Sequence, residues 1–583
     1  MVVKEAGDER SSSWFKWSRW HCTAFILAAA TSFQVAATSL TKSPIFNEPA
    51  HLVAGLGHWN HGDFDRYQVN PPLARLCQTL LPTFVCPAVA TDLSPESSSN
   101  RSEFWIGRSY FETFPERSDV GLRLARVSNQ GFLWLALALS WTLAGGRSRP
   151  SVGLSAVALF AANPVLTGWY AYAVPTGPSV AMSLLALAAF LRMVARPRWS
   201  RIGVAGLAFG LAVGTKSSLA LLAPFLLVSA IGLHWRRGLW RRTWFWLRRV
   251  PAYAFAATLA LNAVYGFAPR TDLESLPLES VRMTDFRSAA ASIPGLGTAI
   301  GVALPKPFVR GIDIQMRDFE RGMESYLMGV TADHGWKSYY VYGWLYKTPI
   351  ILLAVQCVAF ASFRPRGRRP SRSDGAIRYR TLLISAAGFF VAVSLHDGFS
   401  GHYRYSLPAI GLATPAIATV LNRRRRPSLM SKLMMSGAVA QGLMAGTNGI
   451  AYFNELPTGM PANCVPLVGS SSSWGQDFGE SILQADRMSD RAYCKIESPV
   501  TPNYYGVGRP TRVGVVNAGG GSVVILRGFH FLSDAEVTLG QDRDVVATFF
   551  SDHPVHHRIG NSVSVYFVRS DHRLNVIPEP PNR

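Results

Sequence analysis

A series of long apolar runs divides the chain and limits its fold more than any other feature. Several of these runs continue for about 18 to 20 residues without interruption, the length that an α-helix needs to cross a bilayer. A chain of 583 residues with 48% hydrophobic side chains in this arrangement cannot form one soluble globule. The sequence predicts an α-helical polytopic membrane protein.

Basic residues punctuate these apolar runs. The formal net charge is +22, which taken alone would suggest a nucleic-acid partner. The basic residues instead gather in short segments between alternate runs, at 147–149, 192–201, 236–249, 364–380 and 423–426. Because an excess of lysine and arginine marks the cytoplasmic loops of membrane proteins, we interpret the clusters as topology signals and expect no nucleic-acid binding.

The pattern predicts about eleven transmembrane helices. The first, at 21–40, lacks a small-residue cleavage pattern and is interpreted as an anchor. The others are expected at 126–144, 152–169, 177–194, 202–214, 217–233, 250–267, 343–363, 381–395, 405–421 and 433–452. The spans at 202–214 and 217–233 are short, and we expect a tight helical hairpin around Thr215 and Lys216.

This arrangement divides the chain into a cytoplasmic tail (1–20), a transmembrane domain (21–452) and a C-terminal domain (453–583). Counting membrane crossings from a cytoplasmic N-terminus places the loops 41–122 and 268–342 and the C-terminal domain together on the outer side of the membrane. Apolar and polar residues alternate at 513–516, 522–526 and 562–568, with a triple glycine at 519–521. We therefore expect a small β-containing extracytoplasmic domain, which either guides a substrate or takes no part in the site.

Cysteines occur as two pairs within the predicted outer regions. Cys77 and Cys86 share the first loop, and Cys464 and Cys494 share the C-terminal domain. Each pair can form a disulfide in an oxidising compartment, and the spacing equally permits free thiols. No cysteine and histidine spacing indicates a zinc site.

Candidate chemical groups concentrate in the stretch 43–73, directly after the first span. Glu48 is a candidate general base, and a carboxylate at the start of a helix near Pro49 is an equally good explanation of it. Asp63 and Asp65 lie in the sequence HGDFD, where the glycine favours a turn over a catalytic or metal-binding role.

Three cations stand near the ends of apolar spans. Lys216 interrupts the predicted hairpin, and an ionisable residue at membrane depth indicates either a functional site or a snorkelling or internally paired lysine. Arg404, close to His402, lies where a span meets the outer surface; it suits either a phosphate-binding site or an interfacial anchor. Lys347 is expected to anchor a span at the interface.

Several motifs, in order along 43–477, together resemble one family. They read FNEPAHLVAGL, YQVNPPLARL, GLAVGTKSSLALL, SYLMGV, GWKSYYVYGWLYKTPI, HYRYSLP, YFNELP and WGQDF. As a set they are similar to a bacterial branch of the protein O-mannosyltransferase-like (glycosyltransferase family 39-like) enzymes of the GT-C superfamily. The resemblance implies a GT-C-like membrane transferase of the bacterial cytoplasmic membrane. Such an enzyme takes a sugar from a polyprenyl-phosphate carrier on the outer side, uses acidic residues of the first outer loop, and often binds a divalent metal such as Mg²⁺ or Mn²⁺.

The resemblance also implies roles for residues and exposes departures from the family. The first-loop motif has Asp-Glu before a proline and a histidine; Glu48, Pro49 and His51 match it, whereas Asn47 replaces the aspartate. No acidic residue occurs at 172–176, and 469–473 lacks the family's Asp-Ser-Asn pattern. An amide cannot act as a base and binds a divalent cation less well than a carboxylate.

We assign the expected roles accordingly. Because Asn47 supplies no carboxylate, Glu48 is expected to act as the base, to bind the acceptor or to bind the metal. Asp63 or Asp65 is the alternative residue for this role. Lys216 and Arg404 are expected to hold the lipid phosphate, and His51 and His402 to contact the substrate.

Three functions follow from these observations. The first is a hexosyltransferase, mannosyltransferase-like, that moves a sugar from a polyprenyl phosphate to a protein, lipid or glycan acceptor. The second, suggested by Asn47, is an inactive pseudoenzyme that binds a lipid-linked sugar or scaffolds a partner transferase. A transporter is less favoured, because the charged residues gather in the outer loops and not at mid-membrane.

Overall fold

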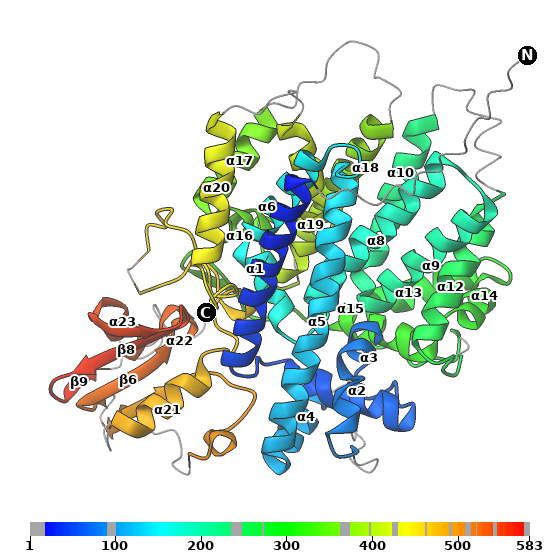
Figure 1. The fold of residues 1–583 in the computed structure, drawn as a ribbon. Helices are drawn as coiled ribbons and strands as arrows, with labels where there is room; N and C mark the ends of the chain where they lie inside the picture. The colour runs from blue at the N-terminus through cyan, green and yellow to red at the C-terminus, as the bar shows by residue number, and fades with distance from the viewer. Residues whose placement is uncertain are drawn as a thin grey trace, which may run out of the picture.

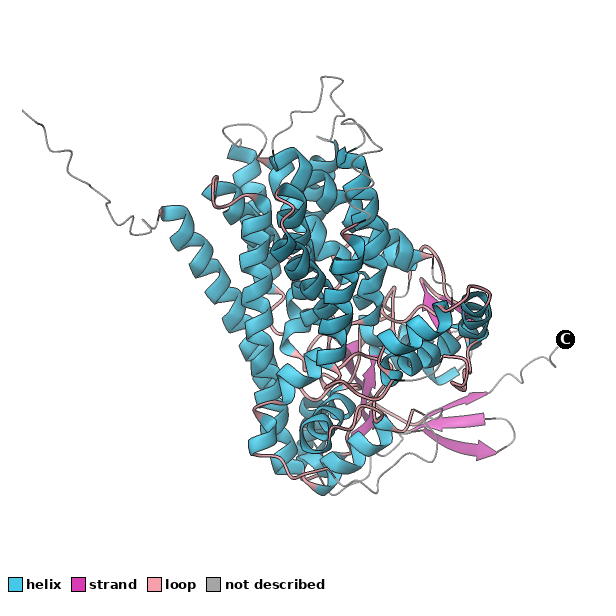
Figure 2. Ribbon diagram, turned by 90° about the vertical axis from the view of Figure 1, so that its right-hand side faces the viewer, coloured by secondary structure: helices cyan, strands magenta, loops and turns pink. Residues whose placement is uncertain are grey.

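The computed structural model describes most of the chain. The described residues are 18–89, 101–234, 248–270, 273–361, 374–395, 398–422, 429–460, 463–488, 492–507, 515–519, 522–539 and 545–575. Within them a bundle of helices carries smaller helices and three small sheets at one end (Figures 1 and 2). The basic segments 236–247, 364–373 and 423–426 and most of the N-terminal tail lie outside the described residues.

The helices of the bundle coincide with the predicted apolar spans. They are α1 (Arg19–Thr41), α5 (Pro115–Ala144), α6 (Pro150–Ala161), α7 (Pro164–Gly168), α8 (Thr176–Ala195), α9 (Trp199–Thr215), α10 (Leu222–His234), α12 (Val250–Val264), α16 (Tyr339–Lys347), α17 (Ile350–Ala361), α18 (Asp374–Ser394), α19 (Leu407–Leu421) and α20 (Leu429–Met444). Among the described residues, two helices, α1 and α8, are individually long and apolar enough to cross a membrane. The number rises to four if each of two bent helix pairs counts as one span. The helical membrane fold is therefore supported, and the count of eleven crossings stays a prediction.

The predicted hairpin around Thr215 and Lys216 is only partly correct. The chain does break at Lys216, which follows α9 and precedes the 3-10 helix η4 (Ser217–Leu221). However, α9 packs mainly against α8 and α12, whereas α10 packs against α18. Gly210 explains why α9 packs against α12. A Cβ at this position would lie 2.1 Å from the carbonyl oxygen of Ala257 on α12, so only glycine permits this close approach.

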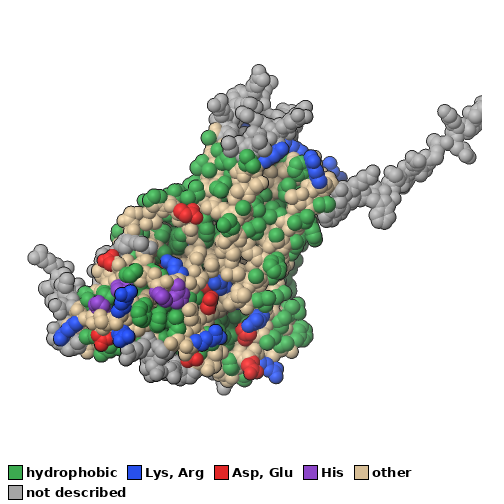
Figure 3. Space-filling model, turned by 60° about the vertical axis from the view of Figure 1, so that its left-hand side comes forward, with side chains coloured by type: hydrophobic (Ala, Val, Ile, Leu, Met, Phe, Trp, Pro, Cys, Tyr) green, Lys and Arg blue, Asp and Glu red, His purple; other side chains and the backbone are tan. Residues whose placement is uncertain are grey.

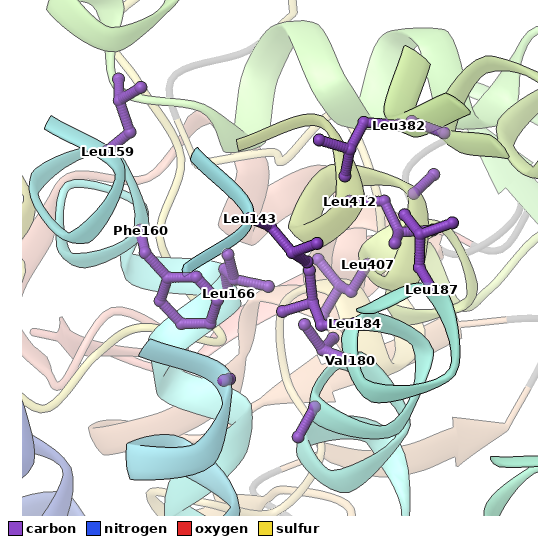
Figure 4. Packing of buried hydrophobic residues seen from close by; sticks show 14 of the residues in the cluster. Leu143, Leu159, Phe160, Leu166, Val180, Leu184, Leu187, Leu382, Leu407 and Leu412 are labelled. Atoms are coloured by element: carbon purple, nitrogen blue, oxygen red, sulfur yellow. The ribbon is translucent and has the colours of Figure 1, made fainter. Parts of the chain in front are cut away.

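The bundle core is formed by aliphatic and aromatic side chains from helices that are distant in sequence. Figure 4 shows Leu143 of α5, Phe160 of α6, Leu184 of α8 and Leu407 and Leu412 of α19 meeting in one cluster. The outer surface of the bundle is also apolar; Phe33 of α1 is 77% exposed. Figure 3 shows hydrophobic side chains over much of the helical part and most charged side chains toward its lower end, as a lipid-facing belt requires.

The three stretches predicted to share one side lie at the same end of the bundle (Figure 1). The first contains α2 (Glu48–His61), α3 (Leu73–Thr79), the 3-10 helix η1 (Pro82–Phe84) and α4 (Glu103–Thr113). The second contains α13 (Val281–Ala291), α14 (Leu296–Ala303), α15 (Lys306–Arg321) and an antiparallel pair, β1 (Ser325–Leu327) and β2 (Val330–Ala332). Shared placement at one end agrees with the predicted parity.

The C-terminal stretch contains the predicted strands. One sheet has the order β3-β6-β8-β7, formed by β3 (Ala492–Lys495), β6 (Gly528–Ser533), β8 (Val563–Val568) and β7 (Val555–Ile559). The other joins β4 (Val515–Gly519), β5 (Ser522–Ile525) and β9 (His572–Asn575), and the helices are α21 (Phe478–Met488), α22 (Asp534–Leu539) and α23 (Val545–Asp552). All six cysteines are thiols, so neither predicted pair forms a disulfide; Cys464 and Cys494 are buried and Cys77 is exposed.

Candidate active site

A cavity of about 190 Å³ lies where the first outer loop, α15 and the segment before α19 meet. Five residues singled out in the sequence line it, although they come from widely separated parts of the chain: Asn47, His51, Lys216, His402 and Arg404. The other three, Glu48, Asp63 and Asp65, are not among its lining residues. The cavity therefore gathers the predicted binding residues and leaves out the predicted carboxylates.

Lys216 and Arg404 give the cavity its positive charge. Both are largely buried, with 6% and 7% exposure. Lys216 Nζ lies 4.6 Å from the ring centre of Tyr405, and the Arg404 guanidinium lies 5.2 to 5.9 Å from three rings, those of Trp169, Tyr405 and Trp474. Within the described part of the chain, neither cation forms an ion pair with a carboxylate. Two buried cations that face aromatic rings in place of carboxylates leave their charge available to an anionic ligand.

His51 and Asn47 form the wall that the first loop contributes. The His51 ring stacks on Tyr67 at 4.7 Å, and its Nδ1 is buried without a hydrogen-bond partner. Burial, followed by the nearby charges of Arg75 and Arg404, lowers the pKa of His51 well below its ordinary value of 6.5. Asn47 Oδ1 accepts a hydrogen bond of 3.2 Å from the indole of Trp474. The wall is neutral at pH 7.

The segment 469–477 reaches the cavity through Trp474. His402 shares a hydrogen bond of 2.9 Å with Ser470, and its ring packs edge-on against Trp474 at 5.3 Å. Burial and the charge of Arg404 lower the pKa of His402 well below its ordinary value. Asp477 lies away from the cavity lining, where it forms an ion pair of 2.6 Å with Lys42.

Glu48 lies at the start of α2 in a fully buried ion pair with Arg126 of α5. Its Oε1 accepts hydrogen bonds from Arg126 Nε at 2.8 Å and from the Ala173 amide at 2.7 Å. Its Oε2 accepts hydrogen bonds from Arg126 Nη2 at 2.6 Å and from the Ile45 amide at 2.9 Å. A carboxylate has about four acceptor positions, two on each oxygen, so all of them are occupied. This geometry favours the structural interpretation of Glu48, and its expected role as a base stays untested.

Asp63 and Asp65 form the predicted turn. Asp63 accepts hydrogen bonds from the Asp65 amide at 3.0 Å and from Arg66 Nε at 2.9 Å. Asp65 accepts one from Gln68 at 2.6 Å. Their local bonding agrees with the turn that the glycine predicts. The expectation for Lys347 is wrong: it is buried, and its ammonium group donates to the carbonyl oxygens of Ile450 and Ser471.

Sequence reasoning missed Asp318 and Arg101, which both line the cavity. Asp318 lies on α15, and its Oδ2 accepts a hydrogen bond of 2.8 Å from Arg101 Nη1. Arg101 has a φ of 51°, a left-handed conformation that is uncommon outside glycine, and it also pairs with Glu103. Neither residue stands in a recognisable motif; the only signal was their position in the predicted outer loops.

The donor set around the cavity does not fit a divalent metal. Mg²⁺ is held mainly by carboxylate oxygens and water. Among the described residues, no group of three histidine, cysteine or acidic side chains is placed to hold a metal ion. The oxygens of Glu48, the expected ligand, are taken by Arg126 and two backbone amides. Positive charge in this site comes from lysine and arginine.

Together the structure shows a helical membrane fold with a cationic cavity, suited to an anionic ligand, at one end of the bundle. Residues 118–261 match a family model described as dolichyl-phosphate-mannose-protein mannosyltransferase. The match includes Arg126 and Lys216 but neither α2 to α4 nor α15. Over these residues the match agrees with the resemblance carried by the motifs to the protein O-mannosyltransferase-like membrane glycosyltransferases.

Solved structures give a looser likeness. The crystal structure of ArnT from Cupriavidus metallidurans bound to undecaprenyl phosphate is 12% identical, with a TM-score of 0.46 over 93% of this chain and 97% of that one. The archaeal oligosaccharyltransferase AglB from Archaeoglobus fulgidus, in complex with an inhibitory peptide and a dolichol-phosphate, is 12% identical, with a TM-score of 0.42 over 86% of this chain and 61% of that one. No curated protein sequence matches.

Proposed function

We propose that the protein transfers a sugar from a polyprenyl-phosphate carrier to an acceptor on the outer side of the bacterial cytoplasmic membrane. The observation that carries this proposal is the pair of buried cations, Lys216 and Arg404, on one cavity with no carboxylate partner in the described residues. A phosphodiester is an anion of the size and charge that such a pair binds.

The leaving group explains why two cations suit this reaction. Sugar transfer passes through an oxocarbenium-like transition state, in which the bond to the departing phosphate is largely broken. Negative charge therefore grows on the phosphate oxygens as the reaction proceeds. Lys216 and Arg404, already fixed beside aromatic rings, would stabilise that charge without reorganising.

Aromatic and neutral polar groups line the rest of the cavity. Trp474, Tyr405 and Phe46 offer apolar faces, and Asn47, His51 and Asn70 offer neutral polar groups. Such a lining suits a sugar, which combines apolar faces with hydroxyl groups.

Release of free polyprenyl phosphate from purified protein in lipid nanodiscs tests the proposal. The substrates are a set of polyprenyl-phosphate hexoses with peptide and glycan acceptors, with added Mg²⁺ or Mn²⁺ in one arm and EDTA in another. We expect release that persists in EDTA, since the site's charge comes from its own side chains. Absence of release with every donor and acceptor would contradict a transferase.

A second function is favoured by one observation, the amide at Asn47. The corresponding cavity wall carries no carboxylate from the first loop or from 172–176. A pseudoenzyme would bind the lipid-linked sugar without releasing the lipid phosphate. In that case wild-type protein would bind without turnover, and Asn47→Asp would gain activity; a transferase shows turnover before any substitution.

A further inference from the structure

The cavity has a carboxylate that no motif indicated. Its acidic side chain is that of Asp318, the one carboxylate among the lining residues that the structure describes. Asp318 comes from the second outer loop, on α15, and not from the first loop, where the sequence resemblance directs attention. Its side chain is 21% exposed, whereas that of Glu48 is fully buried.

Asp318 retains an open acceptor position. Its Oδ1 accepts two hydrogen bonds from Arg317, at 2.7 and 3.2 Å. Its Oδ2 accepts one, from Arg101 at 2.8 Å. Since each carboxylate oxygen can accept two hydrogen bonds, one position on Oδ2 is unused. Glu48, by the same count, has none.

The neighbouring arginines fix the orientation of the Asp318 carboxylate. Each arginine also forms a second ion pair: Arg101 with Glu103 at 2.5 Å, and Arg317 with Glu279 at 2.7 Å. The carboxylate is therefore held in place without being the sole partner of either cation.

We propose that Asp318 is the general base that deprotonates the acceptor, in the place that a first-loop carboxylate would otherwise occupy. The inference rests on the proposed transferase function. The acceptor hydroxyl donates its proton to Asp318 Oδ2 as its oxygen forms a bond to the anomeric carbon. The bond from that carbon to the phosphate oxygen breaks, its electron pair stays on the phosphate facing Lys216 and Arg404, and Asp318 later releases the proton to water.

The packing of α15 places Asp318 at the cavity. Gly311 brings the helix against the first loop, since a Cβ there would lie 2.0 Å from the Gln68 carbonyl oxygen. Gln315, one turn before Asp318, accepts a hydrogen bond of 3.0 Å from Ser217, next to Lys216. The helix that carries Asp318 therefore also contacts the residue next to Lys216.

Asp318→Asn tests the proposal in full-length protein in nanodiscs. We expect kcat for polyprenyl phosphate release to fall about 100-fold or more, the usual contribution of a general base. Polyprenyl phosphate binding should stay within about threefold, and the acid limb of the pH dependence of kcat should disappear. Asp318→Glu should recover part of kcat, and the matched control Asp285→Asn, at an exposed position on α13, should leave it unchanged.

A merely structural ion pair gives a different result. If Asp318 only holds Arg101 in position, then Arg101→Gln should lower kcat as much as Asp318→Asn does. Both variants should then keep the wild-type pH dependence of kcat. That result, or an Asp318→Asn variant with kcat within threefold of wild type, overturns the base while leaving the transferase intact. Wild-type protein without turnover overturns both.

Discussion

At the scale of single residues, the ion pair of Glu48 and Arg126 connects four parts of the chain. Besides Glu48, the Arg126 guanidinium donates hydrogen bonds to the carbonyl oxygens of Ser39, Lys42 and Ser43. Glu48 in turn accepts from the Ala173 amide, which lies just before α8. The pair therefore fixes the end of α1, the start of α2, the middle of α5 and the entry to α8.

Glu48→Gln is expected to destabilise the protein. Removing one partner of a buried ion pair leaves the other charge uncompensated, which costs about 3–5 kcal/mol. Thermal unfolding in detergent should show a clear fall in the midpoint, with Glu480→Gln at an exposed site on α21 as the control. An unchanged midpoint together with loss of turnover would instead support Glu48 as the base.

The neutral state of His51 predicts a dependence of stability on pH. Burial and neighbouring arginines lower the pKa of folded His51 well below 6.5, so the unfolded chain binds a proton that the folded protein does not. The free energy of unfolding should be unaffected by this group above pH 6.5 and should fall below it, by up to about 1.4 kcal/mol per pH unit.

His51→Gln removes this contribution. Unfolding midpoints of wild type and variant, measured from pH 7.5 to 5, should therefore approach each other as the pH falls. The comparison cancels the other titrating groups, His402 included. A constant difference across the range would show that His51 is protonated equally in both states.

At the scale of helices, α15 closes one side of the cavity because two glycines let it approach other backbones. Gly311 faces the Gln68 carbonyl oxygen, and Gly398 faces that of Phe319, which a Cβ at 398 would approach to 2.2 Å. Contacts this close exclude any side chain larger than hydrogen.

Gly311→Ala is accordingly expected to displace α15 and lower turnover. The added Cβ would overlap the Gln68 carbonyl oxygen, and overpacking of this kind costs about 1–3 kcal/mol. Gly297→Ala on α14 is the matched control, because its nearest neighbour, Glu274 Oε1, is 3.7 Å away. Equal turnover in the two variants would contradict the role given to α15.

Sequence patterns predicted the helices and the cations of the site for different reasons. The apolar runs contain the helices because lipid contact demands continuous apolar length. The sequence indicates Lys216 because charge at membrane depth is costly, and Arg404 because a guanidinium where a span meets the outer surface suits a phosphate. Asp318 could not be identified in this way: it lies in the polar sequence RDFERG, where charges are expected on any exposed helix.

Contacts between distant segments also escaped sequence reasoning. The partner of Glu48 is Arg126, 78 residues away, and no motif in either segment indicates this pairing. The packing of α9 against α12 likewise depends on where Gly210 meets Ala257. A local sequence pattern predicts a helix or strand. Which other elements pack against it depends on close contacts that form only in the folded chain.

At the scale of the whole molecule, the cavity, α15 and the C-terminal sheets lie toward one end of the bundle (Figure 1). The C-terminal domain is attached there through Asp477, which pairs with Lys42 at the end of α1 and accepts a hydrogen bond from Ser562. The predicted topology assigns this end to the outer side of the membrane.

Single cysteines test that orientation. In a background with all six native cysteines replaced by serine, Asp285→Cys and Glu480→Cys should react with a membrane-impermeant maleimide added to intact cells. Ser148→Cys, at the other end of α5, should react only after the membrane is opened. All three positions are exposed, so accessibility within the protein does not limit labelling. The opposite pattern would place the cavity on the cytoplasmic side.

Binding of polyprenyl phosphate to the purified protein tests the central claim most directly. Wild type, Lys216→Gln, Arg404→Gln, the double variant and the exposed-site control Lys337→Gln should be compared in nanodiscs. A charge-assisted contact contributes about 1.5–3 kcal/mol, so each cavity substitution should weaken binding about 10- to 100-fold. The double variant should lose binding and the control should keep it. Equal affinity in all five proteins would contradict the assignment of this cavity as the lipid phosphate site.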